Sequence, residues 1–344
     1  MTLAPESTLM FAEAAQAADV VAHQYSTNRG PIETLARRLR SAPPRAVATC
    51  ARGSSDHAAT FAKYLIETVL ELPVSSIAPS VSSVYGSTHQ LTGTLLIAIS
   101  QSGRSPDLLR AVETGQAGGA LVAALVNDAG SPLAAKADAF IPLQAGAEKS
   151  VAATKSYITS LAAIVDLVAE WAQDGELARA LGDAPALLRA SWQLDWSPLV
   201  DGLVDARSLY VIGRGPGLGI AQEAALKFKE TCGLHAEAFS AAEVRHGPMA
   251  LIGPDFPLLV FRQADEAAHG VDALVGEALA QGATVYCAGG RIDGAIALPC
   301  IEAPSAIEPL LQIQSFYRAV NALSVARGHD PDRPPHLRKV TETV

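Results

Sequence analysis

The clearest indication of the fold is the stretch Thr94-Leu95-Leu96-Ile97-Ala98-Ile99-Ser100-Gln101-Ser102-Gly103-Arg104-Ser105. Its first half is apolar and has the length of a buried strand. Its second half is polar, with three hydroxyl side chains and a glycine, and a helical pattern begins at Asp107. A buried strand followed by a polar loop and a helix is the repeating unit of a parallel α/β sheet.

The same alternation extends on both sides of this stretch. Apolar runs predict strands at residues 46–50, 74–77, 94–99, 120–126 and 139–143. Helices are predicted over 56–69 and 154–171, and two N-terminal helices over 8–25 and 32–39, with a turn at 28–31 between these two;. This order predicts an α/β fold with a doubly wound parallel sheet flanked by helices, a flavodoxin-like or Rossmann-like three-layer sandwich.

The pattern restarts after residues 182–198, which hold Gly182, Pro185 and Pro198. Further strands are predicted at 209–213, 258–261, 284–288 and 295–301, and helices at 220–231 and 307–327. An offset of 162 residues aligns Ala51-Arg52-Gly53 with Gly213-Arg214-Gly215 and also pairs two strands of each half. We therefore predict a duplication with two domains, residues 1–190 and 191–344.

Composition excludes several classes of protein. Of 344 residues, 49% are hydrophobic and 18% charged, which argues against disorder;. The net charge of −9 argues against a nucleic-acid partner and means that an anionic substrate needs a local binding device;. No membrane span or signal peptide is predicted, so we expect a cytoplasmic protein. The cysteines and histidines lack ligand spacing, and we expect neither a metal nor a cofactor.

Two loops that follow predicted strands have the character of a phosphate cradle. They combine small hydroxyl side chains with backbone N–H groups at the start of a helix. The candidate ligands are Ser54, Ser55, Ser100, Gln101, Ser102 and Ser105. The offset aligns Ser100-Gln101-Ser102 with Arg262-Gln263-Ala264, which has no hydroxyl, so only the first half is expected to hold phosphate. The alternative is that these serines only cap helices.

These features resemble the sugar-isomerase (SIS) domain family, and the two-copy arrangement resembles the isomerase half of glucosamine-6-phosphate synthases. The resemblance runs from Met10 to Glu342 and implies two tandem SIS domains. Besides the Ser100–Gly103 loop, its motifs are Ser150-Val151-Ala152-Ala153-Thr154-Lys155, Ala225-Leu226-Lys227-Phe228-Lys229-Glu230, His235-Ala236-Glu237, Val244-Arg245-His246-Gly247-Pro248-Met249-Ala250-Leu251 and Leu337-Arg338-Lys339-Val340-Thr341.

Two departures from the synthases bear on the reaction. The chain begins almost at the first repeat, without the glutaminase domain and its N-terminal cysteine, and Arg104 stands where the synthases have an acidic residue. Both departures favour relatives that release ammonia or an amine from amino-sugar phosphates.

The resemblance also implies catalytic residues. Glu223, Lys227 and Glu230 share one face of a helix, a spacing that by itself also fits a solvated ion-pair stripe. The resemblance makes Glu230 the base that moves a proton between C1 and C2, with Lys227 supporting its charge. His246 would open the sugar ring and reach into the site of the neighbouring subunit of a homodimer. Lys339 would form an imine with the open-chain carbonyl.

Val151 is expected to contact the sugar through its backbone, and Arg338 to line the pocket. The expected function is an amino-sugar-phosphate isomerase/deaminase that converts glucosamine 6-phosphate to fructose 6-phosphate and ammonia. A fructosamine-6-phosphate deglycase and an ammonia-dependent glucosamine-6-phosphate synthase share the site and remain open. A sugar-phosphate-sensing regulatory protein is the alternative from another class. The residues do not distinguish gluco from galacto epimers.

Overall fold

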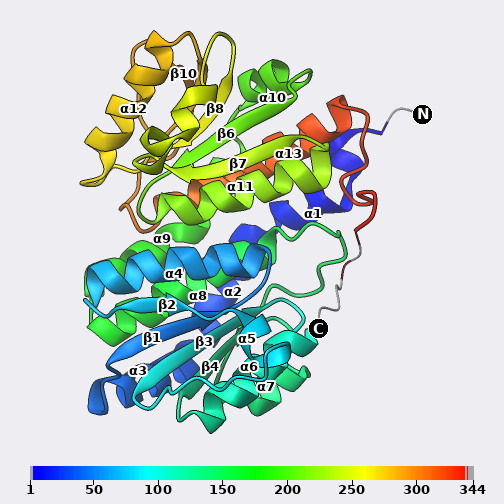
Figure 1. Ribbon diagram of the computed structural model, residues 1–344. Helices are drawn as coiled ribbons and strands as arrows, with labels where there is room; N and C mark the ends of the chain where they lie inside the picture. Colours follow the sequence, from blue (N-terminus) through cyan, green and yellow to red (C-terminus); the bar gives the residue numbers. More distant parts are fainter. Residues whose placement is uncertain (1–2, 338, 340–344) are drawn as a thin grey trace. The chain divides into compact units, whose positions relative to one another are not determined.

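The computed structural model describes residues 3–337 and 339, which form two compact units, each built on a five-stranded parallel sheet (Figure 1). We call them the first-sheet unit (residues 19–148 and 155–182, with Lys339) and the second-sheet unit (residues 3–18, 149–154 and 183–337). The units exchange short segments of chain, so no single cut separates them. The tandem-domain division at residues 190/191 stays a prediction.

The first-sheet unit has the strand order β2-β1-β3-β4-β5 with every neighbouring pair parallel. Its strands are β1 (Ala46–Cys50), β2 (Val74–Ser76), β3 (Thr94–Ser100), β4 (Leu121–Val126) and β5 (Ala139–Pro142). Its helices are α2 (Ala17–Thr27), α3 (Arg29–Ser41), α4 (Ser54–Val69), α5 (Pro79–Ser83), α6 (Pro106–Ala117), α7 (Pro132–Lys136) and α8 (Lys155–Ala172), and α9 (Gly175–Trp192) begins here.

Strand β3 shows why this sheet is covered on both faces. Leu96 and Ala98 pack in one core cluster with Leu108 and Val112 of α6. Their neighbours Leu95, Ile97 and Ile99 point to the other face, and they are buried as well;. Figure 1 shows helices on both sides of the sheet, which confirms the predicted three-layer, doubly wound arrangement.

The second-sheet unit repeats this architecture. Its order β10-β9-β8-β6-β7 is the first order read from the other edge. Its strands are β6 (Ser208–Gly213), β7 (His235–Ser240), β8 (Pro257–Phe261), β9 (Thr284–Ala288) and β10 (Ile296–Leu298). Its helices are η1 (Pro5–Ser7), α1 (Leu9–Ala15), α10 (Ser197–Leu203), α11 (Gly217–Cys232), η2 (Glu243–His246), η3 (Pro248–Leu251), α12 (Ala268–Ala280) and α13 (Glu308–Ala326).

Aromatic packing joins α11, β8 and α13 in the core of the second-sheet unit. The ring of Phe316 on α13 stands edge-on to Phe228 of α11 at 5.1 Å and to Phe261 of β8 at 6.1 Å between centroids. All three side chains are fully buried. This packing fixes the position of α11, and Gly233 in the left-handed conformation ends that helix;.

Some predicted boundaries were wrong for identifiable reasons. The helix predicted over 8–25 breaks at Gln16, between α1 and α2, close to where the chain leaves the second-sheet unit. The turn predicted at 28–31 is the first turn of α3, because Pro31 has no N–H that would need a partner there;. Strand β7 was not predicted, and neither was α12.

In the described part of the chain, no helix is both long and apolar enough to cross a membrane.

Asp166 on α8 provides a test of this packing. Burial, and then the nearby Glu170 carboxylate, raise the pKa of Asp166 to about 6. The folded state therefore holds this proton more tightly than the unfolded chain, and the charged form costs stability as pH rises from about 4 through about 6. We predict that Asp166→Asn stabilises the protein by about 2 kcal/mol at pH 7.

The same substitution should change the free energy of unfolding by only about 0.5 kcal/mol at pH 4, where the carboxyl is protonated in the folded state and about half protonated in the unfolded chain. Urea unfolding at the two pH values measures this difference. An equal effect at both values would contradict the burial argument.

Candidate active site

The strand order of the first-sheet unit separates two loops at the carboxyl ends of its strands. After β1 the chain crosses to the edge strand β2, and after β3 it continues to β4 on the other side. In sheets of this order, ligands bind outside the carboxyl ends of the strands at the point where the winding direction changes. That point lies between β1 and β3, where the loops carrying Arg52–Ser54 and Gln101–Ser105 begin.

The loop after β3 is shaped by Ser100 and Gly103. The Gly103 N–H donates to the Ser100 hydroxyl at 2.9 Å. Gly103 has φ +63°, and a Cβ there would lie 2.4 Å from the Ser131 hydroxyl oxygen, so a larger residue is excluded;. Gln101, Ser102 and Ser105 are half-buried along this loop, a degree of exposure that leaves them accessible to a small ligand.

Helix capping does not account for all of these serines. Ser105 occupies the N-cap position of α6 but forms no side-chain cap hydrogen bond. Gly53, in a positive-φ conformation, occupies the N-cap position of α4, so Ser54 and Ser55 are the first two residues of that helix. Two helices thus begin at the crevice with serines at or near their first turns, an arrangement suited to an anion.

The equivalent crevice of the second-sheet unit is filled by its own side chains. Ala264, which aligns with Ser102, donates its N–H to the Glu308 carboxylate at 2.8 Å. Gln263 is buried and donates to Gln312 at 2.7 Å, and a Cβ on Gly217 would clash with the Gln263 side chain. An internal carboxylate thus takes the N–H equivalent to that of Ser102, which supports the prediction that only the first half holds phosphate.

Helix α11 carries a buried charge cluster. The Lys227 ammonium lies 3.1 Å from a Glu223 oxygen and 2.7 Å from a Glu230 oxygen. The Tyr317 hydroxyl donates to the same Glu223 oxygen at 3.0 Å. Glu223 and Lys227 are fully buried, whereas the Glu230 side chain is 21% exposed. This cluster is therefore not a solvated ion-pair stripe.

Burial and charge act in opposite directions on Lys227. Burial by itself lowers the pKa of this amine, but the adjacent carboxylates of Glu223 and Glu230 more than offset it, so the net shift is upward. Lys227 therefore stays protonated and holds Glu230 by a charge-assisted hydrogen bond. Glu230 lines a pocket of about 350 Å³ whose other lining residues are Leu226, Lys229, Gly233, His329, Pro335 and Leu337.

His246 ends the short helix η2 and is exposed. Its neighbour Arg245 is fixed by Glu277, with two hydrogen bonds of 2.9 and 3.0 Å. Gly247 follows with φ +129°, a conformation that L side chains rarely adopt;. Among the described residues the His246 side chain has no hydrogen-bond or ion-pair partner, so its imidazole is accessible.

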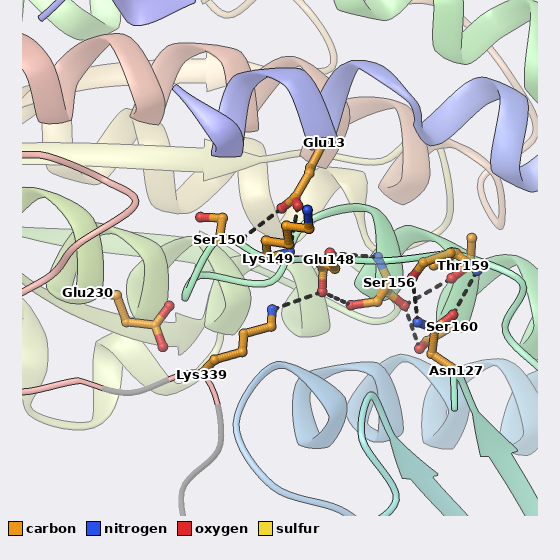
Figure 2. Close-up of polar contacts among 12 residues, drawn as sticks. Glu13, Asn127, Glu148, Lys149, Ser150, Ser156, Thr159, Ser160, Glu230 and Lys339 are labelled. Atoms are coloured by element: carbon orange, nitrogen blue, oxygen red, sulfur yellow. Dashed lines mark hydrogen bonds and ion pairs between the residues drawn. The ribbon is translucent and has the colours of Figure 1, made fainter. Parts of the chain in front are cut away.

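The motif around Val151 is held by two buried carboxylates that the sequence did not single out as ligands. In the second-sheet unit, Glu13 accepts the N–H groups of Lys149 at 2.5 Å and Ser150 at 3.1 Å. These bonds fix the backbone just before Val151. Figure 2 shows the Glu13 carboxylate directed at this segment.

In the first-sheet unit, Glu148 accepts the N–H and the hydroxyl of Ser156 at 3.1 and 2.6 Å. The Lys339 ammonium lies 3.3 Å from the same carboxylate (Figure 2). Lys339 is thus anchored through Glu148 to the start of α8. Arg338, the expected pocket-lining residue, lies outside the described residues.

Within each unit, the structure brings together several of the predicted residues. It joins Lys227 with Glu230, and it places the six candidate phosphate ligands at the carboxyl ends of the neighbouring strands β1 and β3. The residues that sequence reasoning missed are Glu13 and Asp107, and Glu148 had no assigned role. Over the described residues, no group of three or more His, Cys, Asp or Glu side chains is arranged to hold a metal ion.

These features define a double α/β protein of the doubly wound, three-layer class. The family model for the SIS domain matches residues 42–169 and 202–309, and the chain belongs to the SIS-domain family. The two matched segments correspond to the two sheets.

Known proteins similar to this chain agree with this assignment. The isomerizing glutamine–fructose-6-phosphate aminotransferase of Pyrobaculum aerophilum is 35% identical over 328 residues, which cover 91% of this chain and 53% of that protein. The chain thus spans about half the length of the curated relatives it matches.

Solved structures show the same architecture. One from Silicibacter pomeroyi, assigned provisionally as a phosphosugar isomerase, is 42% identical with a TM-score of 0.91, covering 94% of this chain and all of that one. The C-terminal domain of glucosamine-fructose-6-phosphate aminotransferase from Francisella tularensis has a TM-score of 0.87 at 23% identity, covering 95% of this chain and 98% of that domain. The latter likeness concerns the fold alone.

The charge cluster on α11 yields a stability prediction. Lys227→Met leaves the buried Glu223 carboxylate without its cation, and we expect a loss of about 3–5 kcal/mol in the free energy of unfolding. Lys229→Met, on the same helix but exposed, should change it by less than about 0.5 kcal/mol. Urea unfolding of both variants measures the two changes in the free energy of unfolding. Equal changes would show that the charge cluster is not buried.

Proposed function

We propose that this protein converts glucosamine 6-phosphate and water into fructose 6-phosphate and ammonia. The observation that carries the proposal is the partly exposed Glu230 carboxylate, held at a pocket by a fully buried, protonated Lys227. A fixed carboxylate with access to a ligand is what a 1,2-proton transfer requires.

In this proposal the phosphate binds at the serine-bearing loops of the first-sheet unit. His246, supplied by the neighbouring subunit of a homodimer, protonates the ring oxygen and opens the sugar to its C1 aldehyde. Glu230 then removes the proton from C2 while O1 takes up a proton from solvent, which leaves an enaminol. Glu230 returns its proton to C1 while the nitrogen on C2 releases one to solvent. The product is an imine at C2.

Release of ammonia follows from that imine. Lys339 adds through Nζ to C2 and displaces the substrate nitrogen as ammonia, which forms a lysine imine. Water then adds to C2, and Lys339 leaves as the free amine with fructose 6-phosphate as the product. The sequence consumes one water and releases one ammonia. In this proposal Glu148, which holds Lys339 by an ion pair, accepts its proton before the attack.

One observation favours a free amino sugar over an amino-acid conjugate. A deglycase would need a cation for the carboxylate of the conjugate, and Arg104 is the candidate that stands where the synthases have an acid. The Arg104 guanidinium already binds the Asp128 carboxylate at 2.8 Å, and the Asp128 pKa is lowered by that hydrogen bond. Both side chains are exposed, which supports a surface role for the pair.

The test is to supply glucosamine 6-phosphate and follow ammonia and fructose 6-phosphate together. We expect both products at equal rates. Glu230→Gln should lower kcat by roughly 10²- to 10⁴-fold, because the amide cannot accept the proton. Glu176→Gln, the same change at an exposed glutamate of α9, serves as the matched control and should retain activity.

Equal activity of Glu230→Gln and the wild-type protein would refute the mechanism. Release of an amine from fructosamine 6-phosphate conjugates, without turnover of glucosamine 6-phosphate, would identify a deglycase instead.

A further inference from the structure

An ion pair joins the two loops of the proposed phosphate site. Arg52, which follows β1, donates through Nε and Nη2 to the Asp107 carboxylate at 2.9 and 2.8 Å. Asp107 lies in the first turn of α6, which follows β3, and its side chain is fully buried. The Arg52 side chain is 48% exposed. The pair therefore spans the crevice between β1 and β3, with its cation on the accessible side.

The guanidinium has donors to spare. Arginine carries five N–H donors, and the two bonds to Asp107 use two of them;. Among the described residues, the Arg52 side chain donates to Asp107 alone. The guanidinium is planar, and the two bonds to Asp107 orient its plane, so that the remaining donors match the geometry of a phosphate group;.

The second half of the chain serves as an internal comparison. The 162-residue offset aligns Arg52 with Arg214, and Asp107 with His269. Arg214 thus lacks a carboxylate at the equivalent position, and its crevice already contains the Glu308 carboxylate on the Ala264 N–H. A fixed arginine therefore occurs in the half that carries the serine loops. In the part of the chain that the structure describes, no carboxylate fixes Arg214 in the same way.

Charge balance explains why a cation is needed here. The chain has a net charge of −9, and the six candidate phosphate ligands, five serines and Gln101, supply only neutral donors. The buried Asp107 would also oppose a phosphate dianion unless its charge were compensated. Arg52 supplies a positive charge for the phosphate and also compensates the charge of the Asp107 carboxylate.

We propose that Arg52 is a phosphate-binding residue of the sugar-phosphate site and that Asp107 is its positioning residue. The proposal rests on the proposed function only in placing the phosphate at these loops. It assigns the affinity for the phosphate group to a charged residue in addition to the serines.

Binding of inorganic phosphate tests this independently of turnover. Phosphate should raise the Tm of the wild-type protein, because a ligand that binds the folded state stabilises it. Arg52→Gln should weaken phosphate binding roughly 10- to 100-fold, the range expected for hydrogen bonds to a charged group. Arg214→Gln, the matched change in the other repeat, should bind phosphate as the wild type does.

Removing Arg52 alone leaves the buried Asp107 carboxylate without a cation, which destabilises the folded state. The double variant R52Q/D107N removes both charges and keeps the shape of the pair. It should fold, with an unfolding midpoint close to that of the wild type without phosphate, and show the same loss of phosphate binding. A folded double variant that binds phosphate as tightly as the wild type would overturn the proposal.

The positioning role of Asp107 is tested by kinetics. With glucosamine 6-phosphate, Asp107→Asn should raise KM several-fold and leave kcat nearly unchanged, since the phosphate is remote from C1 and C2. In the Arg52→Gln background, Asp107→Asn should cause no further increase in KM. An equal increase in both backgrounds would show that Asp107 does not act through Arg52.

The outcomes for the two proposals are separable. Phosphate binding that depends on Arg52, in a protein that does not turn over glucosamine 6-phosphate, would support this inference and refute the deaminase. Turnover by a protein whose phosphate affinity and KM do not depend on Arg52 would support the deaminase and refute the role of Arg52.

Discussion

The winding order of the parallel sheet is the constraint on which the other features depend. Each parallel strand delivers its following loop to the same edge, and the change of direction between β1 and β3 separates two of those loops;. Helices α4 and α6 therefore both begin at that edge. The second sheet has the same order, yet Gln263 and Glu308 fill its crevice. The strand order provides a position where a ligand can bind, and the residues of the loops determine whether the protein's own side chains occupy that position.

A second theme is the use of buried charge to fix a partly exposed group. Lys227 holds Glu230, Glu148 holds Lys339, and Asp107 holds Arg52. In each pair the buried partner is immobilised by packing or by further hydrogen bonds, while the other keeps access to solvent. An exposed ion pair has little energetic value, but a pair with one buried member gives its exposed member a defined position.

Much of the fold was predictable because buried parallel strands are continuous apolar runs. Strands β1 and β9 were predicted with their observed bounds. Strand β7 was missed because it is an edge strand with several exposed residues, and His235-Ala236-Glu237 has no such run. The serine loops were found because hydroxyls directly after a strand are a local signal. Asp107 and Glu13 were missed because their partners lie 55 and 136 residues away.

The exchange of segments between the units has a consequence for how such a chain can evolve. A duplicated domain can ordinarily be lost, swapped or recombined with other modules. Here α1 is fastened into the second-sheet unit by Asp332, which accepts the Leu9 and Met10 N–H groups, and by Thr8, which donates to Asn321. Lys339, beyond the second sheet in the chain, pairs within the first-sheet unit. Each half of the gene thus encodes a part of the other half's unit, and the two copies are inherited as one indivisible module.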